Sequence, residues 1–369
     1  MRGIRLRSYC SEVVKGILRE ALESKRETIM SGRSRIASGI IRGDNAEEFA
    51  NTTRVELNTM FYLIDSIATT ESSSTLYDYL DCYLREFKRE EIGVIILRGA
   101  ELSSLRLIDF LGSIGVRPSG THKSVWLINV PVSTEMNPFD WPIVLHELGH
   151  MIEHESLRIL QGMGKITNYG SLPDPNDIEG KRALMALEYL CDLVAFRLAG
   201  PVVFFRVMDA YLTQSFAVPK THPEWYRRLA HLMKDSTIED EAVFSPYAAK
   251  LYAQVKEECE KEEAMADSTY PPYMDEMKAK ISGNIERRRF AKKDVKLAFE
   301  RLSGFQPYTQ DASLIITCGY LVVARQKRFK GGVKEQFSDE YRLVSEFQYL
   351  VSDCIRLTRL RSLVTPFLN

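Results

Sequence analysis

One segment limits what this chain can fold into more than any other: residues 141–155, W-P-I-V-L-H-E-L-G-H-M-I-E-H-E. It carries His146, Glu147 and His150 in the order H-E-x-x-H. Residues four apart lie on one face of an α-helix, so both imidazoles can reach one ion while Glu147 lies beside it. Neutral imidazole is a good zinc ligand, and a carboxylate next to the metal can take the proton from a zinc-bound water. The segment therefore predicts a helix with a zinc site and a general base.

Other residues of this segment predict how the helix begins and packs. Asp140 is expected to be its N-cap, and Pro142 is tolerated in the first turn. Glycine inside a helix costs about 1 kcal/mol relative to alanine, so Gly149 indicates close approach of another backbone or of a substrate. The alternative to a metal site is an amphipathic core helix in which both histidines make ordinary hydrogen bonds.

The composition is that of an ordinary soluble globular protein, with 369 residues of which 45% are hydrophobic and 27% charged. The 49 basic and 50 acidic residues nearly balance, so no overall charge attracts nucleic acid or an anionic membrane. The six cysteines are scattered without a C-x-x-C pair, which indicates reduced thiols. The N-terminus lacks the apolar core of a secretory signal, and the longest apolar run, Leu314–Ala324, is too short to span a membrane. We therefore expect a cytoplasmic protein without nucleic-acid partners.

Hydrophobic periodicity divides the first part of the chain into helices and strands. Residues 9–30 and 46–90 have apolar positions at helical spacing. Buried strands are predicted at Ile92–Leu97 and Val125–Val130, with a short helix at Leu102–Leu111 between them. The second strand leads into the zinc helix. If it is an edge strand beside a zinc cleft, it can bind an extended peptide by strand addition.

The segment after the zinc helix, residues 161–180, is rich in glycine and turn-forming residues. A loop of this length is either a lid that contacts substrate or a disordered connector, and both alternatives stay open. Lys181–Ala199 is then a strong helix, and the rest of the chain is mostly helical. We predict three regions: an N-terminal helical region (1–90), a catalytic core (91–235) and a C-terminal helical region (236–369).

Catalytic zinc usually has three protein ligands, so the two histidines need a third partner. His154 shares their face but lies about 12 Å along the helix axis from His146, too far to share one ion. We expect it at the rim of a cleft or exposed. Glu188 is on a separate helix, and Asp192 follows one turn later on the same face, where it can accept a hydrogen bond from a ligand histidine. These positions predict one zinc per chain, held by His146, His150 and Glu188.

H-E-L-G-H at 146–150 followed by E-Y-L-C-D at 188–192 resembles the glutamate-zincin (gluzincin) peptidases, the superfamily that includes thermolysin. Residues 188–201, E-Y-L-C-D-L-V-A-F-R-L-A-G-P, are similar to a segment of the ImmA/IrrE-type regulatory peptidases, from which they depart at Cys191, Val194 and Gly200. The H-P-x-x-x-x-R pattern of His222, Pro223 and Arg228 resembles an element of the HtpX-like and prenyl-protein peptidases. Those last families are embedded in membranes, and this chain has no predicted span.

The resemblance implies zinc-dependent hydrolysis of polypeptides, with Glu147 as the general base and Asp192 as a hydrogen-bond partner of a ligand. Such an enzyme also needs a cationic or phenolic donor to stabilise the oxyanion. Arg228 and His222 are the first candidates, and Arg228 is favoured by its resemblance alone. A structural role for Arg228, as a charge that pairs two helices, is an open alternative. The further candidates for this donor are His231 and Tyr189.

Together these features predict an α+β, predominantly helical fold: a zincin-like core with a small sheet and helical flanking regions. The predicted function is that of a soluble zinc metalloendopeptidase. The alternative is a zincin-shaped binding or scaffold protein with a structural zinc, although Glu147, which takes no part in ligation, favours the enzyme. A third hypothesis is a regulatory peptidase with one dedicated target. The sequence leaves the substrate, the cleavage preference, the oligomeric state and the trigger open.

Overall fold

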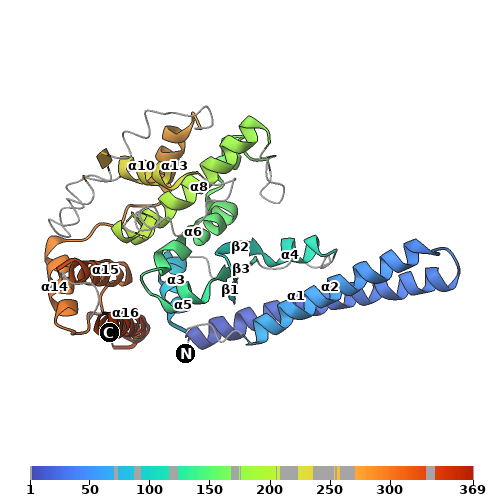
Figure 1. Ribbon diagram of the computed structural model, residues 1–369, viewed down its shortest axis with the longest axis horizontal. Coiled ribbons are helices and arrows are strands. Elements are labelled where there is room, and N and C mark those ends of the chain that lie inside the picture. The colour runs from blue at the N-terminus through green and yellow to red at the C-terminus, as the bar shows by residue number, and fades with distance from the viewer. Residues whose placement is uncertain are drawn as a thin grey trace. The chain divides into compact units, whose positions relative to one another are not determined.

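The computed structural model describes residues 2–69, 74–86, 93–115, 124–167, 174, 176–204, 206–207, 223–235, 253, 256–257, 271–329 and 337–368. Within these ranges the chain is predominantly helical and contains one three-stranded sheet, which confirms the predicted mostly helical α+β class (Figure 1). Two compact units are present, Met1–Tyr77 with Leu84–Val132, and Asp78–Tyr83 with Ser133–Asn369. The zincin-like core and the three regions bounded at residues 90 and 235 stay predictions. None of the described helices is both long enough and apolar enough to cross a bilayer.

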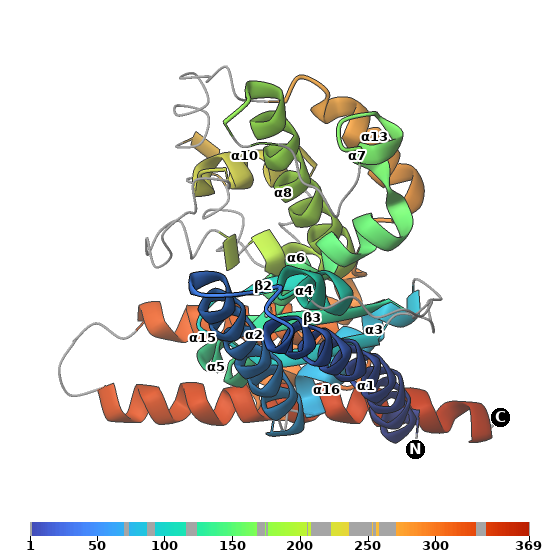
Figure 2. The ribbon, with the colours of Figure 1, turned by 90° about the vertical axis from the view of Figure 1, so that its right-hand side faces the viewer.

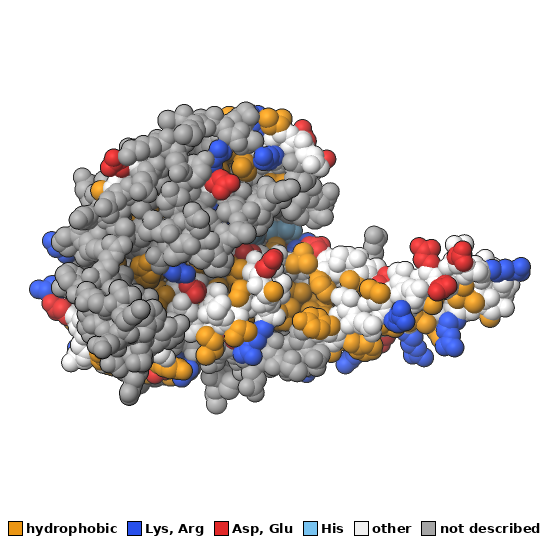
Figure 3. All heavy atoms as spheres, viewed as in Figure 1, with side chains coloured by type: hydrophobic (Ala, Val, Ile, Leu, Met, Phe, Trp, Pro, Cys, Tyr) orange, Lys and Arg blue, Asp and Glu red, His pale blue; other side chains and the backbone are white. Residues whose placement is uncertain are grey.

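The first unit begins with a helical hairpin formed by α1 (Arg2–Ala37) and α2 (Asp44–Thr69), which lie side by side in both views (Figures 1 and 2). The connection turns at Gly39 and Gly43, whose φ angles of 72° and 54° favour glycine. The segment 46–90 contains two helices, because α2 ends at Thr69 and a separate helix, α3 (Ser74–Glu86), agrees with the second helical start that the hydroxyl residues Ser72–Thr75 predict. On the viewed surface of the hairpin, acidic and basic side chains alternate with scattered hydrophobic ones (Figure 3).

The sheet of the first unit has the order β1-β3-β2. Its central strand β3 (Val125–Val130) is parallel to β1 (Gly93–Arg98) and antiparallel to β2 (Ser103–Arg106). The condition for binding a peptide by strand addition is not met at Val125–Val130, because β3 is not an edge strand and both of its sides are paired. The predicted helix at Leu102–Leu111 is also wrong in its first half, since Ser103–Arg106 pairs with β3 and the helix α4 comprises Leu107–Ser113. Short apolar runs do not distinguish a strand from a helix until their pairing partner is known.

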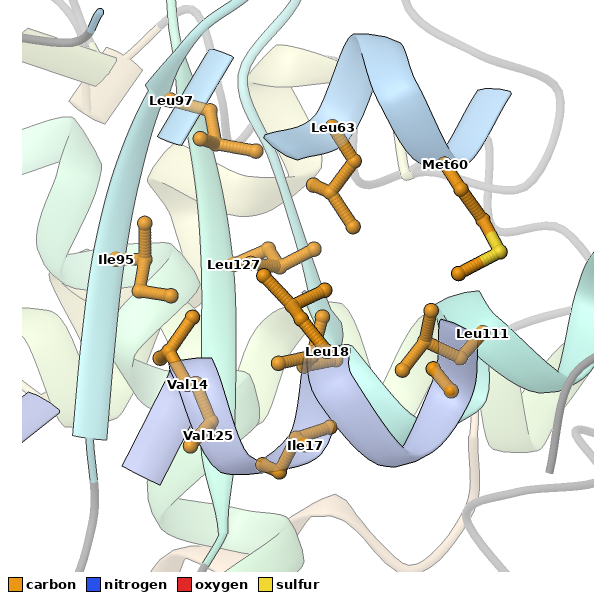
Figure 4. Packing of buried hydrophobic residues seen from close by; sticks show 12 residues of the cluster. Val14, Ile17, Leu18, Met60, Leu63, Ile95, Leu97, Leu111, Val125 and Leu127 are labelled. Atoms are coloured by element: carbon orange, nitrogen blue, oxygen red, sulfur yellow. The ribbon is translucent and has the colours of Figure 1, made fainter. Parts of the chain in front are cut away.

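The hydrophobic core of this unit joins the hairpin to one face of the sheet (Figure 4). Side chains at alternate positions of a strand share a face, and here they meet the i, i+3, i+4 stripe of α1. Burying one such side chain contributes about 1.5–3 kcal/mol, so the hairpin base and the strands stabilise each other. The principal members are Val14, Ile17 and Leu18 of α1, Met60 and Leu63 of α2, Ile95 and Leu97 of β1, Val125 and Leu127 of β3, and Leu111 of α4.

The second unit is built from helices, with α6 and α8 at its centre. Its described elements are α5 (Val132–Met136, which starts in the first unit), α6 (Trp141–Ile152), the π-helical turn η1 (Glu153–Leu157), α7 (Ile159–Gly162), α8 (Ile178–Ala199), α10 (Trp225–Asp235), α13 (Met274–Asn284), α14 (Lys292–Ser303), α15 (Ala312–Phe329) and α16 (Phe337–Leu368). Helix α8 packs against α6, α10 and α13, and α7 lies beside α13 (Figure 2). Helix α15 packs against α14 and α16.

Candidate metal centre

Helix α6 carries the H-E-x-x-H residues, and its N-terminal end is held by Trp141. The Trp141 ring is 2% exposed and its Nε1 donates to the backbone oxygen of Glu135 at 3.0 Å. Pro142 lies in the first turn, as predicted. Asp140 occupies the N-cap position, as predicted, but it has helical angles (φ −92°, ψ −14°) and its side chain caps no backbone N–H. An N-cap side chain works from an extended backbone, and the Asp140 carboxylate instead accepts from Asn137 at 2.8 Å and pairs with Arg206.

Gly149 lies at a close approach of α6 to α8. A Cβ atom built at this position would lie 2.8 Å from the Cα of Cys191 and 3.0 Å from its backbone oxygen. The close approach predicted for Gly149 is confirmed, and the neighbour is the backbone of α8. This contact brings the face of α6 that carries His146 and His150 up to the face of α8 that carries Glu188.

His146, His150 and Glu188 meet between these two helices. The Nε2 atom of His146 is 3.1 Å from Oε2 of Glu188, and Nε2 of His150 is 3.6 Å from Oε1. One ligand atom from each of the three residues lies within 4.8 Å of the others. Ligand bonds of 2.0–2.2 Å put the ligand atoms of a tetrahedral zinc ion roughly 3.4 Å apart, so this set of two imidazoles and one carboxylate fits a zinc ion. The arrangement is a group that could hold a metal ion, and the identity of the metal stays a prediction.

Asp192 fixes the orientation of the His146 ring. Its Oδ1 atom accepts a hydrogen bond from Nδ1 of His146 at 2.8 Å, which leaves Nε2 of the ring facing Glu188. Burial lowers the pKa of His146, but the charges and hydrogen bonds of Asp192 and Glu188 together outweigh burial and raise it to about 10. A metal ion at Nε2 therefore competes with a proton, as it does wherever its ligands must be deprotonated. The predicted contact between Asp192 and a ligand histidine is present.

Arg228 comes from α10 and lies behind Asp192. Its Nε donates to Oδ2 of Asp192 at 2.7 Å and its Nη2 donates to Oδ1 at 2.6 Å. Burial raises the pKa of Asp192, but the Arg228 guanidinium and, to a smaller extent, His146 together outweigh burial and hold that pKa below its ordinary range. The contact is that of a charge pairing two helices, the structural alternative for this arginine. A role for Arg228 in stabilising an oxyanion stays a prediction.

The remaining candidate residues lie at or beyond the edges of this group. Glu147 is 8% exposed and follows the first ligand directly. His154 lies outside the ligand group, and its Nδ1 is 3.2 Å from a carboxylate oxygen of Glu155. Tyr189 and His231 are both buried, and their rings contact each other in a tilted arrangement with centroids 4.7 Å apart. His222 lies outside the described residues, as does much of the 161–180 segment, so the proposed lid stays a prediction.

Two features of the site were not expected from the sequence. One is the π-helical turn η1, which follows α6 and ends at Arg158, a left-handed residue with φ 46° and ψ 36°. Within it the Glu153 carboxylate is fully buried and accepts from the backbone N–H of Leu160 at 2.9 Å. The other is the pairing of Arg228 with Asp192. The turn contains neither glycine nor proline, and no local spacing connects residues 192 and 228, so neither feature has a signal in the sequence.

No protein family, curated protein or solved structure matches this chain. The resemblance to the gluzincins therefore depends on two short motifs, at residues 146–150 and 188–192, and on the close approach of their side chains.

Proposed function

We propose that this chain is a zinc-dependent peptidase whose metal is held by His146, His150 and Glu188. The observation that carries the proposal is the convergence of these three side chains between α6 and α8, with the Glu147 carboxylate directly beside them in the chain. Glu147 is not a member of the ligand group, which supports a role in proton transfer rather than in metal binding.

The donor set favours zinc over the harder divalent cations. Calcium and magnesium prefer oxygen ligands, whereas two imidazole nitrogens and one carboxylate suit zinc. Structural zinc sites are usually closed by four protein ligands, and catalytic sites keep one position open. The group found among the described residues has three members, which favours a catalytic over a scaffold role.

When bound, zinc would act as a Lewis acid on the scissile carbonyl and lower the pKa of water. Glu147 would take the proton from the attacking water and deliver it to the leaving amide nitrogen, so that the carboxylate is regenerated at the end of the reaction. His146 would keep its Nε2 on the metal because Asp192 holds its Nδ1.

The proposed substrates are unfolded or extended polypeptides. The side chains of His146 and Glu188 are only 8% and 9% exposed, and His150 at 20% is the most accessible ligand. A single extended strand reaches such a buried group more readily than the surface of a folded domain. A regulatory peptidase with one dedicated target remains a narrower version of the same proposal.

The test is the substitution Glu147→Gln, which keeps the size of the side chain but removes the base. Zinc content, measured by elemental analysis, and the circular dichroism spectrum should match those of the wild type. Cleavage of unfolded proteins should fall by about 100-fold or more, the usual contribution of a positioned general base.

Glu155→Gln is the matched control, because this glutamate pairs with His154 outside the ligand group and its loss should leave cleavage unchanged. A wild-type chain that binds no zinc would contradict the proposal. So would a Glu147→Gln chain that cleaves as fast as the wild type.

A further inference from the structure

The Asp192 carboxylate receives three hydrogen bonds from two other helices. Oδ1 accepts from Nδ1 of His146 at 2.8 Å and from Nη2 of Arg228 at 2.6 Å, and Oδ2 accepts from Nε of Arg228 at 2.7 Å. Asp192 is 1% exposed and Arg228 7%. From these contacts we propose that Arg228 is a positioning residue of the metal centre: it fixes the Asp192 carboxylate and, through it, the ring of His146. The inference rests on the proposed function, because it requires His146 to be a metal ligand.

The two-point contact explains why an arginine suits this position. A guanidinium is planar, and two parallel hydrogen bonds to a carboxylate fix the plane of that carboxylate as well as its position. The terminal torsion of an aspartate is otherwise broad, so an unclamped carboxylate would rotate and carry Oδ1 away from His146. Rotation of the His146 ring would in turn move Nε2, which now lies 3.1 Å from Glu188.

A second contact holds Arg228 in place along α10. His231, three residues after Arg228, contacts the ring of Tyr189, three residues before Asp192, and both rings are buried. The two contacts occur in opposite order along the two helices, so α8 and α10 run in opposite directions where they touch. The position of Arg228 relative to Asp192 therefore depends on how α10 packs against α8, and not only on the conformation of the arginine side chain.

A positioning residue and an oxyanion donor affect different measured quantities. An oxyanion donor lowers the barrier once substrate is bound, and its loss reduces turnover while zinc affinity stays the same. A positioning residue prepares a ligand before any substrate arrives, so its loss weakens zinc binding in the free protein. Zinc affinity in the absence of substrate therefore separates the two roles.

The experiment measures zinc dissociation constants of the full chain by competition with a chromophoric chelator, and the visible absorption spectrum of the cobalt-substituted protein. Arg228→Met should bind zinc at least about 10-fold more weakly, the lower end of the effect of losing a partner of a ligand, and its cobalt spectrum should change. Arg228→Lys keeps the charge but not the planar two-point contact, so it should also remain weaker than the wild type.

Arg197→Met is the matched control. Arg197 is also a buried arginine, 9% exposed, and lies on α8 itself, but it donates to the backbone oxygen of Ile285 at 3.1 Å and to Ser282 at 2.7 Å, away from the ligands. Its loss should leave the zinc dissociation constant unchanged even where it lowers the melting temperature. A general effect of removing a buried arginine would instead appear in both variants.

A double variant tests whether Arg228 acts through Asp192. If it does, Arg228→Met combined with Asp192→Asn should bind zinc no more weakly than Asp192→Asn alone. Wild-type affinity in Arg228→Met, full restoration in Arg228→Lys, or additive losses in the double variant would each overturn the inference. If Arg228→Met does not fold, the comparison of Arg228→Lys with the wild type decides. Absence of zinc binding by the wild type would overturn the proposed function itself, which is a different result.

Discussion

At the scale of single residues, the two side chains that were candidates for the third zinc ligand, Glu188 on α8 and His154 in the π-helical turn, have different expected effects. Glu188 faces both ligand histidines, whereas His154 pairs with Glu155 in the π-helical turn. We expect Glu188→Gln to weaken zinc binding by more than the roughly 10- to 100-fold that follows loss of a ligand's partner. His154→Ala should retain zinc. Dialysis followed by elemental analysis measures both, and equal losses in the two variants would show that the third ligand is wrongly assigned.

The residues of the candidate site differ in how far the sequence predicted them. His146, His150, Glu188 and Asp192 were predictable because each pair is four apart on one helix, a spacing that determines a shared face. Arg228 was named only by resemblance, and its contact with Asp192 was not foreseen. That contact depends on how α10 packs against α8, and packing between distant helices leaves no periodic pattern in the sequence.

At the scale of elements, the approach of α6 to α8 depends on the missing side chain at Gly149. The Cβ of Gly149→Ala would meet the Cα of Cys191 at 2.8 Å, and a backbone atom cannot move aside as a flexible side chain can. We expect the variant to lose about 1–3 kcal/mol of unfolding free energy, the usual cost of overpacking, and to bind zinc more weakly because the ligands span this contact. Urea unfolding and chelator competition measure the two effects.

Gly16→Ala is the control for that prediction. Gly16 is also inside a helix, α1, and a Cβ there meets nothing within 4 Å. Alanine at this position should stabilise the chain by about 0.4–1 kcal/mol and leave zinc binding unchanged. Equal behaviour of the two glycine variants would mean that the contact with Cys191 does not limit the distance between α6 and α8.

The long helices were predicted well because their hydrophobic periodicity extends over many residues. Strand pairing was predicted poorly because hydrogen bonds to distant strands determine the conformation of β2 and the order of the strands in the sheet. The helices α1, α2 and α8 follow from apolar stripes many residues long. The strand β2 was missed because its four residues take their conformation from hydrogen bonds to β3, which lies about twenty residues further along the chain. The position of β3 in the middle of the sheet is likewise a long-range fact that its own sequence does not contain.

At the scale of the whole molecule, the chain has two units with separate internal packing, and the candidate metal centre belongs entirely to the second. A ligand stabilises the folded state that binds it, by about 2.7 kcal/mol at a free concentration 100 times its dissociation constant. Removing zinc with a chelator should therefore lower the melting temperature of the second unit and leave that of the first unchanged. Differential scanning calorimetry measures this as two transitions, of which one moves.

The core variant Leu127→Ala assigns the transitions. Leu127 is 3% exposed in the core of the first unit, and truncation of a buried leucine typically costs about 2–5 kcal/mol. The Leu127→Ala substitution should lower the melting temperature of the transition that the chelator leaves unchanged. One cooperative transition that shifts as a whole in both experiments would mean that the two units do not unfold independently.

The π-helical turn after α6 has a consequence for how the chain tolerates changes in length. Its i→i+5 hydrogen bonds enclose one more residue than the i→i+4 bonds of an α-helix, so the turn absorbs an extra residue without altering what precedes it. Deletion of Ser156 would let the α-helix run on and rotate the following segment about the axis. His146, Glu147 and His150 lie upstream and would keep their register. Deletion of one residue between the two histidines would shorten their spacing from four to three and turn one ring about 100° around the helix axis relative to the other. Length variation is therefore tolerable on one side of Ile152 and not on the other.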